Sequence, residues 1–214
     1  MKHLSEAVPK DLFEQTFGTV REKVLATNLQ ELEVARAKDI PGICMFVWDE
    51  MVHRGVVKKP QKIAPIVNND FEGVYRFVKR QLGRDPVSDA YAVSYYNELD
   101  DGYSFADATI VQCYPNDLHI ADVEFADNRK PISNGSVRKG RRSYHGLHVF
   151  GEFIDRLKQV AKSRDVGRLS LMVGDADLYP VFSRHGFKVN ETEMAQVAYK
   201  QFGVGYPMIL KVGS

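Results

Sequence analysis

The chain has 214 residues, of which 44% are hydrophobic and 27% are charged, and its formal net charge is +1. This length and balance predict one globular domain with a substantial core and exclude wholesale disorder. The longest apolar runs are far shorter than the roughly 20 residues of a membrane span, and the N-terminus shows no apolar signal segment. Cys44 and Cys113 sit among apolar neighbours without metal-binding spacing, so we expect a cytoplasmic, non-membrane protein with buried, reduced thiols.

The first third of the chain reads as helical because its hydrophobic residues recur mainly at helical spacing. We expect a helix over residues 19–38, an extended connection with two prolines over residues 57–67, and another helix over residues 71–82. Residues 43–54 suit either a buried helix or a strand, and we favour a helix. These segments predict an enlarged helical N-terminal region over residues 1–86. It would pack on a second region, residues 87–214, within what is one structural domain overall.

After Pro86 the spacing of hydrophobic residues changes to that of strands. Three runs of β-forming residues, separated by short turns, predict an antiparallel meander over residues 90–96, 106–114 and 118–126. In the third run Leu118 and Ile120 fall on one face, whereas Val123 and Phe125 fall on the other. A β-bulge between the two pairs would restore a single apolar face.

The last part of the chain contains the clearest helix, over residues 147–162, with hydrophobic residues on one face. A short buried strand follows over residues 168–173. After it we expect a helix from Asp175 to His185, with Asp177 as its cap, and two final strands over residues 187–200 and 205–212. Gly186 occupies the usual position after a helix C-terminus. The order of elements predicts a mixed α/β (α+β) fold.

Positive charge is concentrated between Arg129 and Arg142, a segment that holds six basic residues and no acid. Outside it, 23 basic residues face 28 acidic ones, so the rest of the chain has a net charge of −5. The segment leads into the clearest helix, and a helix N-terminus offers free N–H groups and partial positive charge to a phosphate. A phosphate-binding site and a solvated basic loop are the two interpretations that follow.

The order of motifs around this segment resembles a known family. Arg141 and Arg142 precede residues 143–148, which read Ser-Tyr-His-Gly-Leu-His, and the later helix ends with Leu178–Phe187. From Val123 to Phe187 the chain is similar to the core of the GNAT (GCN5-related N-acetyltransferase) superfamily. That core has a bulged strand, a pyrophosphate loop of pattern [Q/R]-x-x-G-x-[G/A], a long helix, a strand and a helix ending in Tyr-x-x-x-Gly-Phe.

The chain also departs from the family pattern. Ser143 stands where the family favours Gln or Arg, and His148 stands where it favours a small residue. The family's phenol, which often protonates the departing thiolate, falls at Phe182, which has no proton to give. Tyr179, one helical turn earlier, either supplies a displaced hydroxyl or packs, and both readings stay open. Asp175 matches the Asn that is usual earlier on that helix.

The resemblance implies a mixed, mostly antiparallel central sheet flanked by helices. It also implies a site that binds acetyl-CoA or another acyl-CoA and transfers the acyl group directly to an amine. Backbone groups at the end of the bulged strand would hold the pantetheine, and the basic loop would hold the pyrophosphate. The residues expected to bind the coenzyme are Phe125, Ala126, Arg138, Arg141, Arg142, Ser143, Tyr144, His145, Gly146, Leu147, His148, Asp175 and Phe182.

Acyl transfer to an amine needs a base, because only the neutral amine attacks the thioester. Glu124 is the first candidate, since it lies on the bulged strand where GNAT enzymes often place a base. Asp122 is the second candidate, and the alternative for each is a solvated strand residue. Tyr179 is the candidate proton donor to the leaving thiolate.

The histidines have other expected roles. His145 and His148 lie at the start of the long helix, where they suit hydrogen bonding to phosphate, although packing is equally open for His148. His119 and His185 read as structural. No pair of histidines has metal-binding spacing with carboxylates, so we expect no metal.

Three functions follow from the sequence. The first is an acyl-CoA-dependent N-acyltransferase. The alternative is a catalytically degenerate GNAT-fold protein with a binding or structural role, which Phe182, Ser143 and His148 suggest. A nucleic-acid role through Arg129–Arg142 is disfavoured by the net negative charge of the rest of the chain. The identity of the acceptor amine is not defined by the sequence, and a homodimer stays open.

Overall fold

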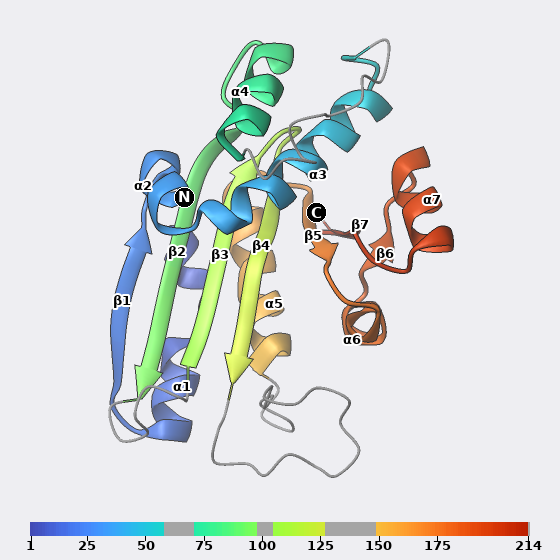
Figure 1. The fold of residues 1–214 in the computed structure, drawn as a ribbon. Helices are drawn as coiled ribbons and strands as arrows, with labels where there is room; N and C mark the ends of the chain where they lie inside the picture. Colours follow the sequence, from blue (N-terminus) through green and yellow to red (C-terminus); the bar gives the residue numbers. More distant parts are fainter. Residues whose placement is uncertain (58–70, 98–104, 127–148, 214) are drawn as a thin grey trace.

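The computed structural model describes residues 1–57, 71–97, 105–126 and 149–213 (Figure 1). The elements in chain order are η1 (Leu4–Ala7), α1 (Lys10–Phe17), β1 (Val20–Ala26), α2 (Leu29–Ala35), η2 (Ala37–Asp39), α3 (Ile40–His53), α4 (Phe71–Leu82), β2 (Val87–Asn97), β3 (Phe105–Cys113), β4 (Asp117–Ala126), α5 (Val149–Ser163), β5 (Arg168–Val173), η5 (Ala176–Leu178), α6 (Tyr179–Arg184), β6 (Lys188–Val189), α7 (Glu193–Gln201) and β7 (Tyr206–Lys211). The η elements are short 3-10 helices.

The described strands form one seven-stranded sheet of order β1-β2-β3-β4-β5-β7-β6. All neighbouring strands are antiparallel except β4 and β5, which run parallel. The parallel pair is joined by a crossover that contains α5, as parallel strands require. This confirms the expected fold class, a mixed and mostly antiparallel sheet flanked by helices.

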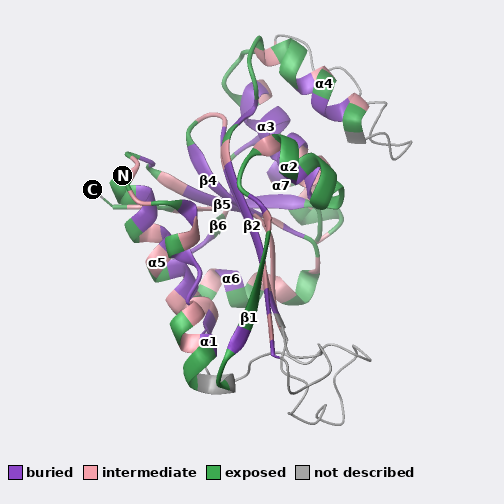
Figure 2. Ribbon diagram, turned by 90° about the vertical axis from the view of Figure 1, so that its left-hand side faces the viewer, coloured by how far each residue is buried: buried purple, intermediate pink, exposed green. Residues whose placement is uncertain are grey.

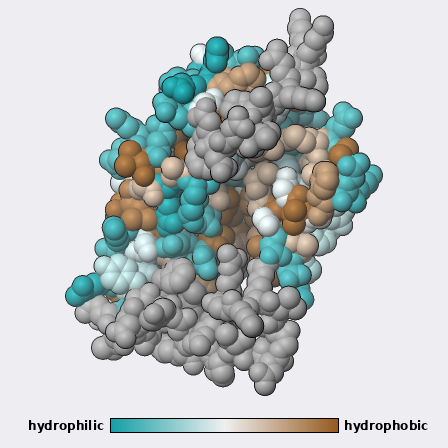
Figure 3. Space-filling view, viewed as in Figure 1, coloured by the Kyte–Doolittle hydropathy of each residue, from teal (hydrophilic) through white to brown (hydrophobic). Residues whose placement is uncertain are grey.

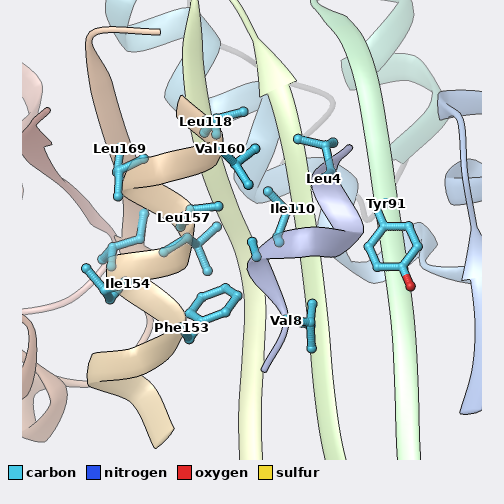
Figure 4. Close-up of a cluster of buried hydrophobic side chains, with 14 of the residues drawn as sticks. Leu4, Val8, Tyr91, Ile110, Leu118, Phe153, Ile154, Leu157, Val160 and Leu169 are labelled. Carbon is cyan, nitrogen blue, oxygen red and sulfur yellow. The ribbon is translucent and has the colours of Figure 1, made fainter. Parts of the chain in front are cut away.

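Helices cover both faces of the sheet, so its strands are buried from two sides. With the sheet seen nearly edge-on, α1 and α5 lie on one side and α2 and α3 on the other (Figure 2). The first core is formed by η1, α1 and α5 against the sheet. Figure 4 shows Phe153 and Leu157 of α5 pointing toward Ile110 of the sheet, with Leu4 and Val8 beside them. The second core lies under α2, α3 and α4 and is equally free of solvent.

The predicted β-bulge is present in β4. Thr109 lies opposite Asp122 and Ile110 lies opposite Ile120, so Ala121 is the extra residue. The bulge moves the second half of the strand by one residue, and an extra residue of this kind reverses the side-chain alternation. As a result the four apolar residues of the strand all contact the first core; they are Leu118, Ile120, Val123 and Phe125.

Several other predictions are confirmed. The helix over residues 71–82 and the strand over residues 168–173 match α4 and β5. The meander corresponds to β2, β3 and β4, the clearest helix to α5, and the segment around residues 43–54 to α3. Gly186 follows the end of α6 with a φ of +90°, a conformation that favours glycine. The predicted connection over residues 57–67 lies outside the described residues, apart from Val57.

The prediction of one helix over residues 19–38 is wrong in its first part. Val20–Ala26 is strand β1, which pairs with β2 at the edge of the sheet, and α2 begins only after Asn28. The Asn28 side chain accepts a hydrogen bond of 3.0 Å from the Glu31 N–H and so caps α2. The region over residues 1–86 is therefore not wholly helical, because it contributes a strand to the common sheet. A boundary at residue 86 stays a prediction.

Two C-terminal predictions are also corrected. The strand over residues 187–200 is wrong, since only Lys188–Val189 is extended and α7 follows, capped by Thr192. The helix expected from Asp175 to His185 begins with η5, and its cap is Asp175 rather than Asp177. The Asp175 carboxylate accepts a hydrogen bond of 2.9 Å from the Asp177 N–H.

Both cysteines are free and buried. Burial raises the pKa of Cys44 to about 12 and raises the pKa of Cys113 well above its usual value, so both thiols stay protonated near neutral pH. Among the helices of the described residues, none is both long enough and apolar enough to cross a bilayer.

Candidate functional site

The central strands β4 and β5 separate part of the way along the sheet. Their parallel pairing covers four residues, from Asp117 opposite Arg168 to Ile120 opposite Leu171. Beyond this point β4 continues to Ala126 beside β3, while β5 soon ends at Val173. The bulge at Ala121 coincides with the separation, because an extra residue bends its strand. One edge of residues 121–126 therefore has no strand partner within the described part of the chain.

The separation gives the molecule an open face. In Figure 1 the gap between β4 and the segment leading to α6 widens toward the end of β4. In the space-filling view a recess with hydrophobic side chains lies between the polar side chains over the sheet and the C-terminal part of the molecule (Figure 3). Backbone groups of an unpaired strand edge can bind an extended ligand with amide groups of its own.

Glu124 and Asp122, the two candidate bases, lie on β4 beside this gap. Both are partly exposed, and they lie on the opposite face of the strand from the apolar residues of the first core. The Asp122 carboxylate is 2.8 Å from the Lys38 ammonium and 3.9 Å from the Arg36 guanidinium. Glu124 lies opposite Asp107 and has no ion-pair partner among the residues that the structure describes. Of the two carboxylates, Glu124 is therefore the one that no described cation neutralises.

Beside Asp122 lies a group of buried or partly buried polar residues, here called the Asp39 cluster, which consists of Arg36, Asp39, Asp107 and Thr109. Arg36 and Asp107 form an ion pair of 3.1 Å. Burial raises the pKa of Asp39, and the nearby negative charge of Asp122 raises it further. In the described residues, one side-chain atom of each member lacks a hydrogen-bond partner, namely Arg36 Nε, Asp39 Oδ2, Asp107 Oδ1 and Thr109 Oγ1. Buried polar atoms are normally satisfied, so the Asp39 cluster is a candidate functional feature.

Sequence reasoning missed the Asp39 cluster because its members come from separate segments. Arg36 was expected near the end of the helix over residues 19–38, Asp39 just after that helix, and residues 107 and 109 in an ordinary strand. They meet because η2 crosses the face of β3 and β4 between α2 and α3. The available signal was Asp39 directly before the apolar run of α3, which is typical of a cap, yet its side chain makes no cap hydrogen bond.

Phe182 and Tyr179 of α6 lie on the other side of the gap. Phe182 is buried, with ring centroids 5.7 Å from Phe150 and 6.3 Å from Phe187. It is a core residue, and a phenyl ring has no proton to donate. The ring of Tyr179 is 5.4 Å from that of Tyr199, and the neighbouring Tyr179 hydroxyl raises the pKa of Tyr199. Tyr179 thus packs against Tyr199, and a role of its hydroxyl in proton transfer stays a prediction.

Other expected binding residues contribute in different ways. The Phe125 ring points into the first core, 5.6 Å from Phe13 and 6.0 Å from Phe153, so only its backbone can meet a ligand. The contact with Phe153 also brings the beginning of α5 close to the end of β4. Asp175 caps η5 through its carboxylate, and nothing is described of the Ala126 side chain.

The expected pyrophosphate loop lies outside the described residues. This applies to Arg138, Arg141, Arg142, Ser143, Tyr144, His145, Gly146, Leu147 and His148. The chain between residues 127 and 148 joins the end of β4 to the first residue of α5. Its role in binding phosphate, aided by the partial positive charge at the start of α5, stays a prediction.

The two histidines expected to be structural are packed among other residues. His119 is buried, its Nδ1 is 3.0 Å from Ser170 Oγ, and its ring stacks on Phe46 at 4.8 Å. Burial lowers the pKa of His119 to about 3, so the ring is neutral near pH 7. His185 packs edge-on against Phe150 at 5.0 Å. Within the described ranges, His, Cys, Asp and Glu side chains form no group of three or more that suits a metal ion.

Comparison with known proteins gives only distant likenesses. No family model matches the chain, and no curated protein matches it either. A GNAT-family acetyltransferase from Staphylococcus aureus Mu50 is similar, with 9% identity, coverage of 91% of this chain and 100% of that chain, and a TM-score of 0.41. The catalytic domain of the Tetrahymena GCN5 histone acetyltransferase, in complex with coenzyme A, has 13% identity, coverage of 92% and 95%, and a TM-score of 0.38. The GNAT-family N-acetyltransferase YhbS from Escherichia coli, in complex with CoA, has 12% identity, coverage of 91% and 82%, and a TM-score of 0.34.

Proposed function

We propose that this chain is an acyl-CoA-dependent N-acyltransferase that moves an acyl group, in the simplest case acetyl, directly from coenzyme A to an amine. The observation that carries the proposal is the separation of β4 from β5 beyond Ile120 and Leu171. It leaves a bulged strand edge open beside two carboxylates and next to the start of a long helix. The motif order between Val123 and Phe187, which resembles the GNAT core, supports the same conclusion.

Binding of the coenzyme follows from this geometry. The pantetheine arm carries amide groups, so it can lie along the open edge of residues 121–126 and exchange hydrogen bonds with their backbone. Phe125 contributes its backbone only, because its ring belongs to the first core. The pyrophosphate would meet the basic loop and the start of α5, with Arg141 and Arg142 as charge-assisted donors.

In the proposed reaction the neutral amine attacks the thioester carbonyl, the C–N bond forms and the C–S bond breaks. Glu124 accepts the proton that the amine nitrogen loses. Glu124 is preferred over Asp122, because Lys38 and Arg36 already neutralise the Asp122 carboxylate. The thiolate takes a proton from Tyr179 or from water, since Phe182 has none to give. Glu124→Gln keeps the size of the side chain and removes the base.

The first experiment measures coenzyme binding. Isothermal titration of the full chain with acetyl-CoA should give saturable binding, and Arg142→Ala should weaken it by about tenfold, as expected for one charge-assisted contact. Arg80→Ala, which removes an exposed arginine of α4, is the matched control and should bind like the parent chain. Absence of binding at millimolar acetyl-CoA would reject the proposal.

The second experiment measures chemistry. Thiol release from acetyl-CoA is followed with a panel of small amines, lysine peptides and protein N-termini, and Glu124→Gln should lower the rate about 100-fold or more without changing acetyl-CoA affinity. Asp155→Asn, an exposed acid on α5, serves as the control. Binding of the coenzyme without thiol release from any amine would favour the degenerate binding protein instead.

A further inference from the structure

A cavity of about 640 Å³ lies between the C-terminal half of α3 and α7. Its volume falls in the range of small-molecule sites. It lies at the opposite end of β4 from the proposed acyl-CoA site, because α3 is bound there to the first residues of both central strands. Glu50 of α3 pairs with Arg168, and Arg168 pairs with Asp117. From Asp117 to Glu124 the strand extends roughly 23 Å.

The walls of the cavity are mainly apolar. Trp48 and Val52 come from α3, and Met194 and Val197 come from α7, with Phe202 just beyond its end. Trp48 is buried and its ring lies 5.4 Å from Phe77, so one wall is held in place. Phe202 is 69% exposed and Val197 is 41% exposed. Solvent-exposed aromatic and branched side chains around a hollow are typical of a ligand site.

Two neighbouring acids of α3 differ in how their charge is compensated. Glu50 is fully buried and lies 2.9 Å from Arg54, 2.9 Å from Arg168 and 2.9 Å from the side-chain amide of Asn190. These donors lower the pKa of Glu50 despite its burial. Its charge therefore needs no further partner.

Asp49 has no comparable compensation and forms part of the cavity wall. It is 2% exposed, and its Oδ2 accepts a hydrogen bond of 2.6 Å from the Thr192 hydroxyl. No Lys or Arg of the described residues forms an ion pair with it, and His53 is exposed at the rim. Burial raises the pKa of Asp49 to about 6 and the charge of Glu50 raises it further, while the hydrogen bond from Thr192 and the charge of nearby His53 offset part of this rise. An ionised carboxylate buried without a cation is costly.

We propose that this cavity binds an organic cation with an apolar body, such as a primary alkylamine. The ammonium group would pair with the Asp49 carboxylate, and Glu193 at the rim would add to the negative potential. The alkyl chain would lie against Trp48, Val197 and Phe202. The cavity supplies apolar area for the body of the ligand, and the uncompensated acid supplies selectivity for its charge. The site is separate from acyl transfer, so the proposal stands without the proposed function.

Trp48 gives a direct test, because it is the only tryptophan of the chain. The full chain is titrated at pH 7.5 with n-octylamine, which is protonated, and with 1-octanol as a neutral ligand of equal length. We expect a saturable change in Trp48 emission with octylammonium and at least tenfold weaker binding of octanol. Octylammonium affinity should also fall as the pH is lowered through about 6, since Asp49 then takes up a proton.

Variants assign the effect to the carboxylate. Asp49→Asn keeps the shape and the acceptor for Thr192, and should lower octylammonium affinity at least tenfold while octanol binding stays unchanged. Asp155→Asn, a remote and exposed acid, is the control and should have no effect. If Asp49→Asn does not fold by far-UV circular dichroism, Val197→Arg at an exposed position places a positive charge at the cavity and should abolish octylammonium binding.

Three results would overturn the proposal. One is the absence of a saturable emission change with octylammonium, and another is equal affinity for octylammonium and octanol. The third is saturation by a lysine-containing helical peptide but not by octylammonium, which would assign the cavity to a protein partner. Because no coenzyme is present in the titration, none of these results bears on acyl transfer.

Discussion

Removal of Arg168 tests the buried ion-pair network at the start of β4 and β5. Its guanidinium donates a hydrogen bond of 3.0 Å to Asp117 and lies 2.9 Å from Glu50. Asp117 is 2% exposed and Glu50 is fully buried. Arg168→Met keeps the apolar stem and removes the charge. It therefore leaves two buried carboxylates in place of a compensated group.

Removal of the guanidinium leaves the two carboxylates with different numbers of partners. Glu50 keeps Arg54 and Asn190, each at 2.9 Å, whereas no second ion-pair partner of Asp117 is found in the described residues. The expected loss is therefore that of one broken buried pair, about 3 kcal/mol at pH 8, rather than twice that value. This corresponds to a roughly 150-fold increase in the unfolding equilibrium constant and to a fall in Tm of about 6–12 °C for a chain of this size.

The assay is urea unfolding followed by Trp48 emission and by far-UV circular dichroism, at pH 8 and at pH 5. Burial already raises the pKa of Asp117 to about 6, and without Arg168 the neutral form is favoured further. The destabilisation should therefore be smaller at pH 5. Adding Asp117→Asn to Arg168→Met should recover at least about 1 kcal/mol at pH 8, because it removes the uncompensated charge. A loss below 1 kcal/mol, or a double variant less stable than Arg168→Met, would refute the reasoning.

Two further predictions concern stability. The native pKa values of Asp49 and Asp117, about 6 against an ordinary value of 3.8, mean that the native chain binds protons between pH 6 and pH 4 that the unfolded chain does not. Each of the two groups contributes about 1.3 kcal/mol, so the free energy of unfolding should rise by about 2–3 kcal/mol from pH 7 to pH 5. The free energy of unfolding should fall again at lower pH as groups with lowered pKa values, such as Glu50, become protonated. Urea unfolding at a series of pH values measures this profile, and a free energy that does not change with pH would contradict the prediction. Phe182→Tyr adds a hydroxyl inside the contact with Phe150 and should cost about 1–3 kcal/mol, whereas unchanged stability with faster thiol release would place position 182 at the gap.

The meander, the bulge and α5 could be predicted because their signals are local. The phase change between Ile120 and Val123 is visible within six residues, and only a bulge reconciles it with one buried face. Helix α5 buries one continuous stripe of hydrophobic residues against the sheet, so the helical spacing of these residues in the sequence matches their burial in the structure. In both cases the residues that the hydrophobic pattern places on one face are the residues that pack against the first core.

Strand β1 and helix α7 could not be predicted, because tertiary contacts decide them. The strand has only its two end residues buried, and Val24 is 48% exposed, so its pattern does not alternate. Its conformation comes from pairing with β2. Helix α7 leaves Val197 exposed, which removes the apolar stripe that would have indicated a helix. Thr192 was the usable signal, since its hydroxyl accepts a hydrogen bond from the Ala195 N–H.

The candidate site was predictable where it depends on chain order and unpredictable where it depends on topology. Glu124 was selected as the base from its place on a bulged strand, and the structure puts it beside the gap. That Lys38 would neutralise Asp122 required knowledge that η2 crosses β4. The packing of Phe182 against Phe150 likewise follows from how α6 meets α5, which no local pattern indicates.

The central strands combine a fixed end and an open end, and the two have separate physical causes. At the fixed end Arg168 is paired with Asp117 in the ladder and ties α3 to both strands through Glu50. At the open end the bulge at Ala121 turns β4 away from β5. Access of the proposed coenzyme to this edge would therefore not require loosening of the core. It follows that Arg168→Met should lower stability while the folded fraction keeps its acetyl-CoA affinity, and that Glu124→Gln should lower turnover while stability stays within about 0.5 kcal/mol of the parent. A large loss of affinity in folded Arg168→Met would show instead that the two ends are coupled.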